Sequence, residues 1–406
     1  MTQPLLPVAD AMAALLARAK PIRQIEKVPL AQAAGRVLGR DVEAHLTQPP
    51  FDASAMDGYA LHSADAPEIG SELTVVGTAA AGHAFEGKIG AGEAVRIFTG
   101  APVPEGADTI LIQEDAEKLD GNRIRTTFAV MPGRHIRPRG QDFAGGEAVL
   151  RAGTVLDFTT VTVAAATNNA ELAVYRKPVV AILATGDELL APGTRPGPSQ
   201  IIASNTFGVS ALVRDNGAEV LDLGIVPDDP QRIEAAISMA RLAGVDVLVT
   251  IGGASVGDHD LVQGVLKSVG MELDFWRIAM RPGKPLMVGT LGDMQVLGLP
   301  GNPVASLVCS LLFLEPYLRR LAHLPERKRE ATVKTLQTLK ANDHRQDYLR
   351  ARLSPDEAGD LVADAYGKQD SSMMKILAHS DCLVVRPPNA PELAAGSPCP
   401  VILLRP

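Results

Sequence analysis

An apolar run near residue 250 ends abruptly in two glycines, and acids follow the glycines. The stretch 245–260 reads VDVLVTIGGASVGDHD, and its turn and polar positions are Gly252, Gly253, Ser255, Asp258 and Asp260. An apolar, β-branched run that ends in glycines predicts a buried parallel strand opening into a loop. In an open α/β sheet, ligands bind at the carboxyl ends of the strands, where paired glycines let a ligand approach the backbone. Acids at that place suit a hard cation such as Mg²⁺. The stretch predicts a site for a phosphorylated substrate and Mg²⁺, and the alternative is an ordinary glycine turn followed by a helix-capping aspartate.

The sequence around this stretch alternates between strand and helix patterns. Strands are expected at 178–185, 218–226, 245–253, 285–291 and 294–301, and helices at 204–217, 229–244, 260–270 and 302–321. Ser204 or Asn205 would begin the first of these helices, and Asp229 followed by Pro230 would cap the second. This alternation predicts a doubly wound parallel sheet with helices on both faces, over residues 178–325.

The rest of the chain has a different character. Residues 46–140 contain short strand patterns between many glycines and prolines, which predicts an inserted β domain. Its flanks, 1–45 and 141–177, would form a mixed N-terminal and linker domain, with helices at 8–19, which Asp10 could cap, and at 29–38. Residues 325–330 resemble a linker, and 331–406 predict a small C-terminal β domain. The expected fold class is therefore multidomain, α/β plus β.

Composition excludes several classes of function. The 406 residues are enough for several domains, and 46% hydrophobic and 21% charged residues are typical of a globular protein. A net charge of −8 gives no general attraction to nucleic acid or membranes, and 4% aromatic residues argue against a base-stacking platform. The three cysteines are scattered, without a zinc spacing or a disulfide framework, and no export signal stands out. A cytoplasmic location is the prediction.

Three further motifs place polar residues at the ends of strand patterns. FDASAMDGYA (51–60) holds Asp57 and RIFTGAPVPEGADT (96–109) holds Thr99, although a tight turn and a β-turn would also explain them. ATGDELL (184–190) ends a strand in Asp187 and Glu188. Two adjacent acids are costly to bury without a partner or a metal, which favours a functional role.

Cationic and helix-initiating motifs follow. RPGKP (281–285) supplies two cations, Arg281 and Lys284, for an oxyanion. LPGNPVAS (299–306) predicts a strand–turn–helix junction, where free amides bind anions, although such a motif is more often explained by plain capping, here by Asn302. Arg350 in DYLRARL and Ser371 in GKQDSSMM would belong either to a site or to a solvated surface.

Taken together and in order, these motifs resemble the MoeA family, the molybdopterin molybdenumtransferases, which include the gephyrin E domain. The motifs that carry the resemblance are SAMDGYA, RIFTGAPVPEGAD, GQDF, TGDEL, SNT, GGASVGDHD, RPGKP, LPGNPVAS and GKQDSS. The resemblance covers essentially the whole chain and implies the last step of molybdenum cofactor synthesis. In that step adenylylated molybdopterin and molybdate give the cofactor and AMP, with Mg²⁺.

The resemblance also implies the assembly and the partners. It implies an elongated homodimer of four-domain subunits, with an active cleft between the β domain of one subunit and the α/β and C-terminal domains of the other. The α/β domain would be similar to the MogA/MoaB proteins. A molybdopterin adenylyltransferase and recipient molybdoenzymes are the further partners that it suggests.

Site residues follow from the resemblance position by position. The implied catalytic residues are Asp57, Thr99, Asp142, Glu188 and Asp258, and the implied metal ligands are Asp187, Glu188 and Asp258. The implied substrate-binding residues are Asp187, Ser204, Asn205, Asp228, Gly252, Gly253, Ser255, Arg281, Lys284, Pro300, Asn302, Pro303, Ser306, Arg350 and Ser371. Arg281 departs from the lysine usual in the family, and the two cations are not interchangeable at a tight anion site.

Two other functions stay open from the sequence. The 178–320 region is also similar to molybdopterin adenylyltransferases, which consume ATP. A non-catalytic scaffold, like gephyrin in its receptor-anchoring role, is the second alternative. The β domain, the LPGNPVAS segment and the C-terminal domain favour the molybdenumtransferase over the first, and the intact acidic and basic motifs favour it over the second.

Overall fold

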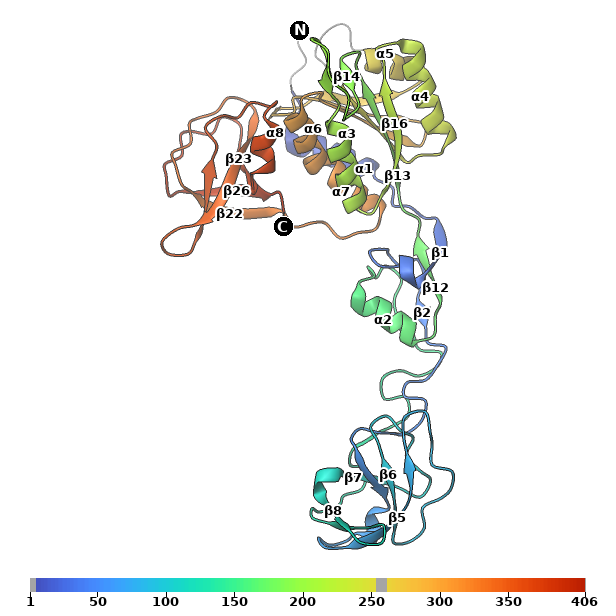
Figure 1. The fold of residues 1–406 in the computed structure, drawn as a ribbon. Helices are drawn as coiled ribbons and strands as arrows, with labels where there is room; N and C mark the ends of the chain where they lie inside the picture. Colours follow the sequence, from blue (N-terminus) through green and yellow to red (C-terminus); the bar gives the residue numbers. More distant parts are fainter. Residues whose placement is uncertain (1–4, 253–260, 406) are drawn as a thin grey trace. The chain divides into compact units, whose positions relative to one another are not determined.

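The computed structural model describes residues 5–252 and 261–405, and its chain divides into two compact units. One unit is Lys27–Val174, and the other joins Met1–Glu26 to Tyr175–Pro406 (Figure 1). Gly253, Ser255, Asp258 and Asp260 lie outside the described residues. No helix within the described ranges is long and apolar enough to cross a lipid bilayer.

The first unit contains a small part built around one short helix. Its core includes Val28, Leu38, Leu156 and Ala164. Asp157 caps the helix because its carboxylate accepts from the amides of Thr159 and Thr160. The hydroxyl of Thr159, and then the amide and hydroxyl of Thr160, lower the pKa of Asp157 to about 2. The elements of this part are β1 (Ile25–Pro29), η1 (Leu30–Gln32), β2 (Val42–Glu43), β11 (Ala148–Leu150), α2 (Phe158–Ala166) and β12 (Glu171–Tyr175).

The helix expected at 29–38 is wrong. Only one 3₁₀ turn, η1, forms there, and Gly35 has φ +78°, a left-handed conformation that an α-helix does not contain. Val37 and Leu38 instead form bridges to Val155 and Val174. Tertiary pairing therefore overrides the local helical pattern.

The other part of the first unit is a six-stranded sheet in the order β7-β4-β6-β5-β9-β8. Alternate residues of its strands enter two cores, so that Tyr59 and Leu61 lie in one and Ala60 and Val95 in the other. The strands are β4 (Gly58–Leu61), β5 (Glu72–Ala79), β6 (Glu93–Ile97), β7 (Thr109–Ile112), β8 (Ala116–Leu119) and β9 (Arg123–Thr126). The short turns η2 (Ser63–Asp65) and η3 (Gln113–Asp115) and the pair β3 (Ala53–Ser54) and β10 (Ile136–Arg137) complete it.

The second unit is centred on a six-stranded sheet in the order β16-β13-β17-β21-β20-β18. In β13, Val180 and Ile182 enter one core and Ala181 and Leu183 the other, so both faces of the strand are buried. The strands are β13 (Val179–Thr185), β16 (Glu219–Val226), β17 (Val247–Ile251), β18 (Glu272–Arg277), β20 (Pro285–Leu291) and β21 (Met294–Leu299).

Helices cover both faces of this sheet, as the sequence predicted. In Figure 1, α4 and α5 lie on one side and α3, α6 and α7 on the other. The helices are α1 (Val8–Arg18), α3 (Asn205–Asp215), α4 (Pro230–Leu242), α5 (Leu261–Ser268), α6 (Pro303–Cys309) and α7 (Glu315–Leu321). Asp229 caps α4 with Pro230 at its first position, whereas Asp10 lies in the first turn of α1 and does not cap it.

Two details differ from the predicted parallel sheet and its long last helix. Four strands are parallel, but β20 runs antiparallel to β21 and β18, because a tight turn at Gly292 (φ +63°) joins β20 to β21 as a hairpin. The apolar helix after residue 302 contains a π-turn, η4 (Ser310–Leu314). Pro316 follows it and has no N–H to continue the α-helical ladder.

The C-terminal domain is a closed barrel of five strands, paired in the ring β23-β24-β22-β26-β25. Tyr348 and Leu383 face outward into the core of the α/β domain, and β19 (Met280–Arg281) adds to β23 in parallel. Its elements are β22 (Glu330–Thr335), β23 (Gln346–Pro355), β24 (Leu361–Ala365), α8 (Met374–Ala378), β25 (Cys382–Arg386) and β26 (Pro398–Leu403).

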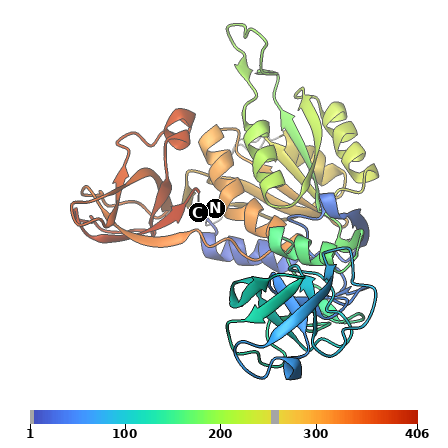
Figure 2. The same cartoon turned by 60° about the horizontal axis from the view of Figure 1, so that its bottom comes forward.

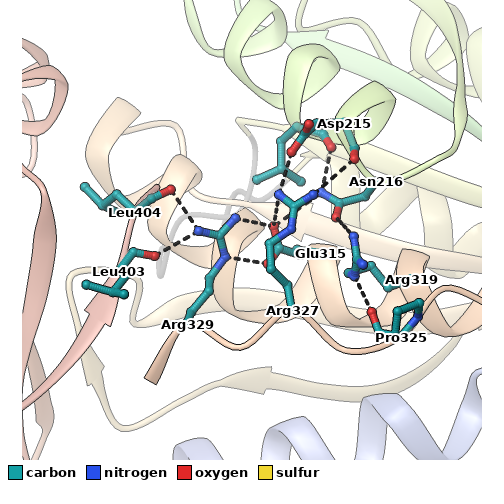
Figure 3. A network of polar contacts seen from close by, with 10 residues as sticks. Asp215, Asn216, Glu315, Arg319, Pro325, Arg327, Arg329, Leu403 and Leu404 are labelled. Carbon is teal, nitrogen blue, oxygen red and sulfur yellow. Dashed lines mark hydrogen bonds and ion pairs between the residues drawn. The ribbon is translucent and has the colours of Figure 1, made fainter. Parts of the chain in front are cut away.

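The segment predicted as a linker, 325–330, carries a buried ion-pair network (Figure 3). The guanidinium of Arg329 binds both oxygens of Glu315, at 2.6 and 2.8 Å, and donates to the carbonyls of Leu403 and Leu404. Arg327 binds Asp215 at 2.6 Å. The segment therefore ties the end of α3 and the start of α7 to the last strand of the barrel.

Candidate functional site

A cavity of about 830 Å³ lies at the carboxyl ends of β13, β17 and β21 in the second unit. This is the edge of an open α/β sheet at which ligands bind. The short strands β14 (Leu189–Leu190) and β15 (Ile201–Ile202) contribute apolar residues to the cavity wall. They flank an arm that projects from the domain in Figure 2. The polar lining residues that the argument uses are Thr185, Glu188, Ser204, Asn205, Asp228, Gly252, Asn302 and Ser372.

An acidic group forms one side of the cavity. Glu188 and Asp228 line it, and the carboxylate of Asp187 accepts from the amide of Asp228 at 3.1 Å. Partial burial, and then the charges of Asp187 and Glu188, raise the pKa of Asp228. A raised pKa means that the negative charge here is under-compensated, which suits a bound cation or a retained proton.

The predicted metal set is only partly placed by the structure. Asp187 and Glu188 lie together at the end of β13, and Asp258 lies outside the described residues. Within 5–252 and 261–405, no group of three or more His, Cys, Asp or Glu side chains has the geometry to hold a metal ion. The described acids fit a hard cation by their chemistry, because carboxylate oxygens are the ligands that Mg²⁺ prefers.

The backbone of the cavity floor requires a glycine at the end of β17. Gly252 has φ +94°, and a Cβ at this position would lie 2.6 Å from the carbonyl oxygen of Thr185. The Oγ1 atom of Thr185 is buried and has no hydrogen-bond partner among the described residues. A buried hydroxyl without a partner costs free energy unless a ligand or water completes it.

The SNT and LPGNPVAS motifs come together across this cavity. The Nδ2 atom of Asn205 donates to the carbonyl of Gly301 at 2.8 Å, and Pro300, Asn302 and Pro303 line the same wall. Ser204 and Asn302 occupy the cap positions before α3 and α6, but neither makes a capping bond with its side chain. Plain capping therefore does not explain either residue.

Ser306 is more enclosed than the sequence suggested. It is fully buried, and its Oγ has no partner among the described residues. Its carbonyl accepts from the hydroxyl of Ser310 at 2.9 Å. Ser306 lies in α6, which begins at the cavity-lining Pro303.

The two cations of RPGKP have different surroundings. The guanidinium of Arg281 is paired with Asp347 and lies 3.6 Å from Asp343, so part of its hydrogen-bonding capacity is already used within the fold. Lys284 is partly buried beside Pro285, which lines the cavity.

Two predicted C-terminal residues also differ in role. The side chain of Arg350 is buried, and its guanidinium donates to protein oxygens rather than to an open space. Burial lowers the pKa of Arg350. Ser371 does reach the predicted site, because its Oγ accepts from Asn302 at 3.0 Å and its carbonyl accepts from the amide of Val304.

In the first unit, the structure brings Asp57 and Thr99 together. The amide and the hydroxyl of Thr99 both donate to the carboxylate of Asp57 at 2.8 Å, and they lower its pKa. Gly58 lets the strand pass close to its neighbour, since a Cβ there would lie 2.0 Å from the carbonyl of Leu111. Asp142 is exposed, and its amide donates to Gln48 instead.

Sequence reasoning missed part of the lining. Ser372 and Met374 come from the barrel domain, and Leu189, Ile201 and Ile202 form apolar wall. The serine was signalled by its neighbour Ser371 in GKQDSSMM. The apolar residues carry no chemical signature, so only the fold could place them.

The chain is similar to known proteins along nearly its whole length. Three family models match: MoeA N-terminal region (domain I and II) over 6–167, probable molybdopterin binding domain over 181–320, and MoeA C-terminal region (domain IV) over 332–404. The molybdopterin molybdenumtransferase of Haemophilus influenzae is 34% identical over 92% of both chains. That of Nostoc sp. is 35% identical over 93% of this chain and 88% of its own.

Solved structures show the same similarity. A molybdopterin biosynthesis MoeA protein from Pyrococcus horikoshii superposes with a TM-score of 0.83 at 29% identity, covering 99% of this chain and 100% of its own. A second structure of that name gives a TM-score of 0.78 at 26% identity, over 98% of this chain and 100% of its own.

Proposed function

The chain belongs to the MoeA family of molybdopterin molybdenumtransferases, and from that premise we propose that it inserts molybdate into adenylylated molybdopterin and releases AMP. Its place among the transferases of molybdenum cofactor biosynthesis follows from the family. The adenylylated substrate and the dependence on Mg²⁺ are the parts that we propose. A cytoplasmic location and a homodimer belong to the same proposal.

One observation carries the proposal, namely that a single cavity combines an acidic wall with a polar wall. The carboxylates of Glu188 and Asp228 line the cavity together with the polar residues Asn205, Asn302 and Ser372. A substrate with a pyrophosphate needs donors for its oxygens and a cation to offset its charge. The volume of about 830 Å³ is within the range of sites for molecules of this size.

Mg²⁺ fits the acidic wall by the chemistry of its residues. Asp187 and Glu188 would hold the ion, and the raised pKa of Asp228 supports an under-compensated negative charge beside them. The bound ion would offset charge on the phosphates as the bond to AMP breaks. Asp258, which lies outside the described residues, is a proposed further ligand.

The chain's own donors would hold the anions. Lys284 offers a point charge beside the cavity, and the hydroxyls of Thr185 and Ser371 offer hydrogen bonds to oxyanion oxygens. Fixed donors of this kind orient the phosphate and the molybdate relative to one another, which lowers the entropic cost of the reaction. Asp57 and Thr99 are proposed to contribute from the β domain.

The test is AMP release by the purified protein given adenylylated molybdopterin, with and without molybdate and with and without Mg²⁺. We expect AMP only when both ions are present, together with cofactor that activates an apo-molybdoenzyme. A parallel reaction with ATP and molybdopterin checks for adenylyltransferase activity, which we do not expect. A protein that binds the nucleotide and leaves it unreacted in every arm would contradict the proposal. Sedimentation velocity tests the homodimer.

A further inference from the structure

Arg350 on β23 is a buried cation with unusual surroundings. It is 1% exposed, yet it forms no ion pair with any carboxylate that the structure describes. Its Nε donates to the Oε1 of Gln369 at 3.1 Å, and its Nη1 donates to the carbonyl of Met373 at 3.1 Å. A buried guanidinium held by neutral oxygens depends on the geometry of those oxygens.

Gln369 uses its whole amide group to hold that position. Its Oε1 accepts from the backbone N of Arg350 at 3.0 Å as well as from Nε. Its Nε2 donates to the carbonyls of Arg350 at 3.1 Å and Tyr366 at 2.8 Å. The side chain thus makes four hydrogen bonds: three join the strand β23 to the segment that follows β24, and the fourth, to Tyr366, lies within that segment.

The segment 366–374, which Gln369 anchors, is part of the cavity wall. Ser372 and Met374 line the cavity. Between Gln369 and these two, Ser371 accepts from the side chain of Asn302 and from the amide of Val304, each at 3.0 Å. The hydroxyl of Ser204 lies 3.4 Å from the sulfur of Met374.

We propose that Gln369 is a positioning residue for the molybdenumtransferase reaction, because it holds Arg350 and the segment 366–374 so that Ser371 and Ser372 meet the substrate in a fixed place. The inference rests on the proposed function of the cavity. Gln369 itself does not line the cavity, and it acts only through the residues that it orders. The neighbouring acid supports the arrangement, since hydrogen bonds from Ser372 keep Asp370 charged and turned toward its own loop.

The consequence of losing Gln369 follows from its bonds. A methionine has nearly the same shape but makes none of the four hydrogen bonds. Segment 366–374 would then sample other positions, and part of the substrate's binding free energy would be spent on ordering it. Uniform loss of binding raises KM and leaves kcat unchanged.

The experiment compares Gln369→Met with Gln346→Met and Gln369→Glu. Gln346 lies on β23, the strand that carries Arg350, and is partly buried. Its side chain makes one hydrogen bond, to the hydroxyl of Tyr348. Gln346 is therefore the control for loss of a side-chain amide that does not hold the segment 366–374. Gln369→Glu keeps the two acceptor bonds to Arg350 and loses the two donor bonds, so it is the conservative variant.

Two readouts are taken for each protein. AMP release at varied concentrations of adenylylated molybdopterin gives kcat and KM. Hydrogen exchange gives the protection of the amides in 302–306 and 366–374, which needs no turnover. For Gln369→Met we expect KM to rise on the order of 10-fold with kcat within about twofold, and faster exchange in both segments. Gln369→Glu should be intermediate, and Gln346→Met should match the wild type.

The outcomes separate the inference from the function on which it rests. A wild type that releases no AMP removes the proposed function, whatever the variants do. If the wild type is active, unchanged exchange in Gln369→Met overturns the positioning role. Faster exchange with an unchanged KM also overturns it, because the loss of order in the segment would then have no effect on substrate binding.

Discussion

Asp57 in the β domain and Asp228 at the α/β cavity are aspartates whose surroundings act on them in opposite directions. The amide of Thr99, and then its hydroxyl, lower the pKa of Asp57. Burial, and then the charges of Asp187 and Glu188, raise the pKa of Asp228. Asp57 already has hydrogen-bond donors within the fold, whereas Asp228 faces the negative charges of Asp187 and Glu188.

This difference assigns the two sites different chemistry. A carboxylate that accepts two strong hydrogen bonds stays ionised and fixed in orientation, so Asp57 is suited to act as a permanent acceptor. A carboxylate beside two others attracts either a proton or a cation. Asp228 and its neighbours are therefore where we place Mg²⁺ in the proposed function, and the following predictions test that division.

The largest expected effect is on turnover. Asp228→Asn removes one charge from the acidic wall without changing its shape, and we expect AMP release to fall by about 10²-fold. Asp57→Asn keeps one acceptor oxygen for Thr99, and we expect a fall of about 10-fold. Steady-state assays of both variants decide the order, and Asp229→Asn, which still caps α4, is the control for an acid near Asp228. Equal losses in the two variants would remove the distinction between the sites.

Cation binding should follow the acidic wall alone. Because Mg²⁺ offsets the repulsion among Asp187, Glu188 and Asp228, it should raise the melting temperature of the wild type. In Asp228→Asn, the Mg²⁺ concentration at half of this effect should rise about 10-fold, whereas Asp57→Asn should match the wild type. Differential scanning fluorimetry over a MgCl₂ series, with Ca²⁺ as comparison, measures it. A similar change in both variants would place the ion elsewhere.

The pH dependence of stability should have opposite signs at the two residues. The raised pKa of Asp228 means that its charge destabilises the fold at neutral pH, and this penalty disappears as pH falls through the folded-state pKa. The lowered pKa of Asp57 means that its charge stabilises the fold above the unfolded pKa of about 3.9, and this contribution is lost below it.

Without divalent ions, the melting temperature of Asp228→Asn should therefore be higher than that of the wild type at pH 7. The difference should be only about 1–2 °C, because solvent screens exposed charges. That gain should vanish toward pH 4. Asp57→Asn should melt slightly below the wild type at pH 7 and converge with it near pH 3. Two variants with differences of the same sign would contradict the opposite surroundings of these carboxylates.

The sequence predicted the elements of the site better than it predicted their contacts. Strands ending in Thr185-Gly186-Asp187 and in Gly252 could be identified from apolar runs that stop at glycines, and the fold places both at one sheet edge. Helix starts at Asn205 and Pro303 were also read correctly. These features are local, and local chemistry determines them.

Contacts between distant segments were beyond the reach of sequence patterns. Arg281 was expected to face an anion, but Asp347 of the next domain pairs with it, 66 positions further along the chain. Arg350 was likewise expected at an open site and is instead buried by a segment that includes Gln369. A charged side chain chooses among partners that only the tertiary fold brings near, so its role follows from packing rather than from spacing.

The smallest expected effect concerns the two donors to Asp57. Thr99→Val removes the hydroxyl donor but keeps the backbone N–H, which is the larger cause of the lowered pKa. The pKa of Asp57 should therefore rise only part of the way toward about 3.9, and Thr99→Ser, which keeps both donors, should leave it unchanged. An NMR titration of the Asp57 carboxyl carbon measures this directly. If Thr99→Val returned the pKa of Asp57 to its ordinary value, the hydroxyl rather than the backbone N–H would keep this carboxylate ionised. The charge of Asp57 would then be controlled by a neighbouring side chain, as that of Asp228 is.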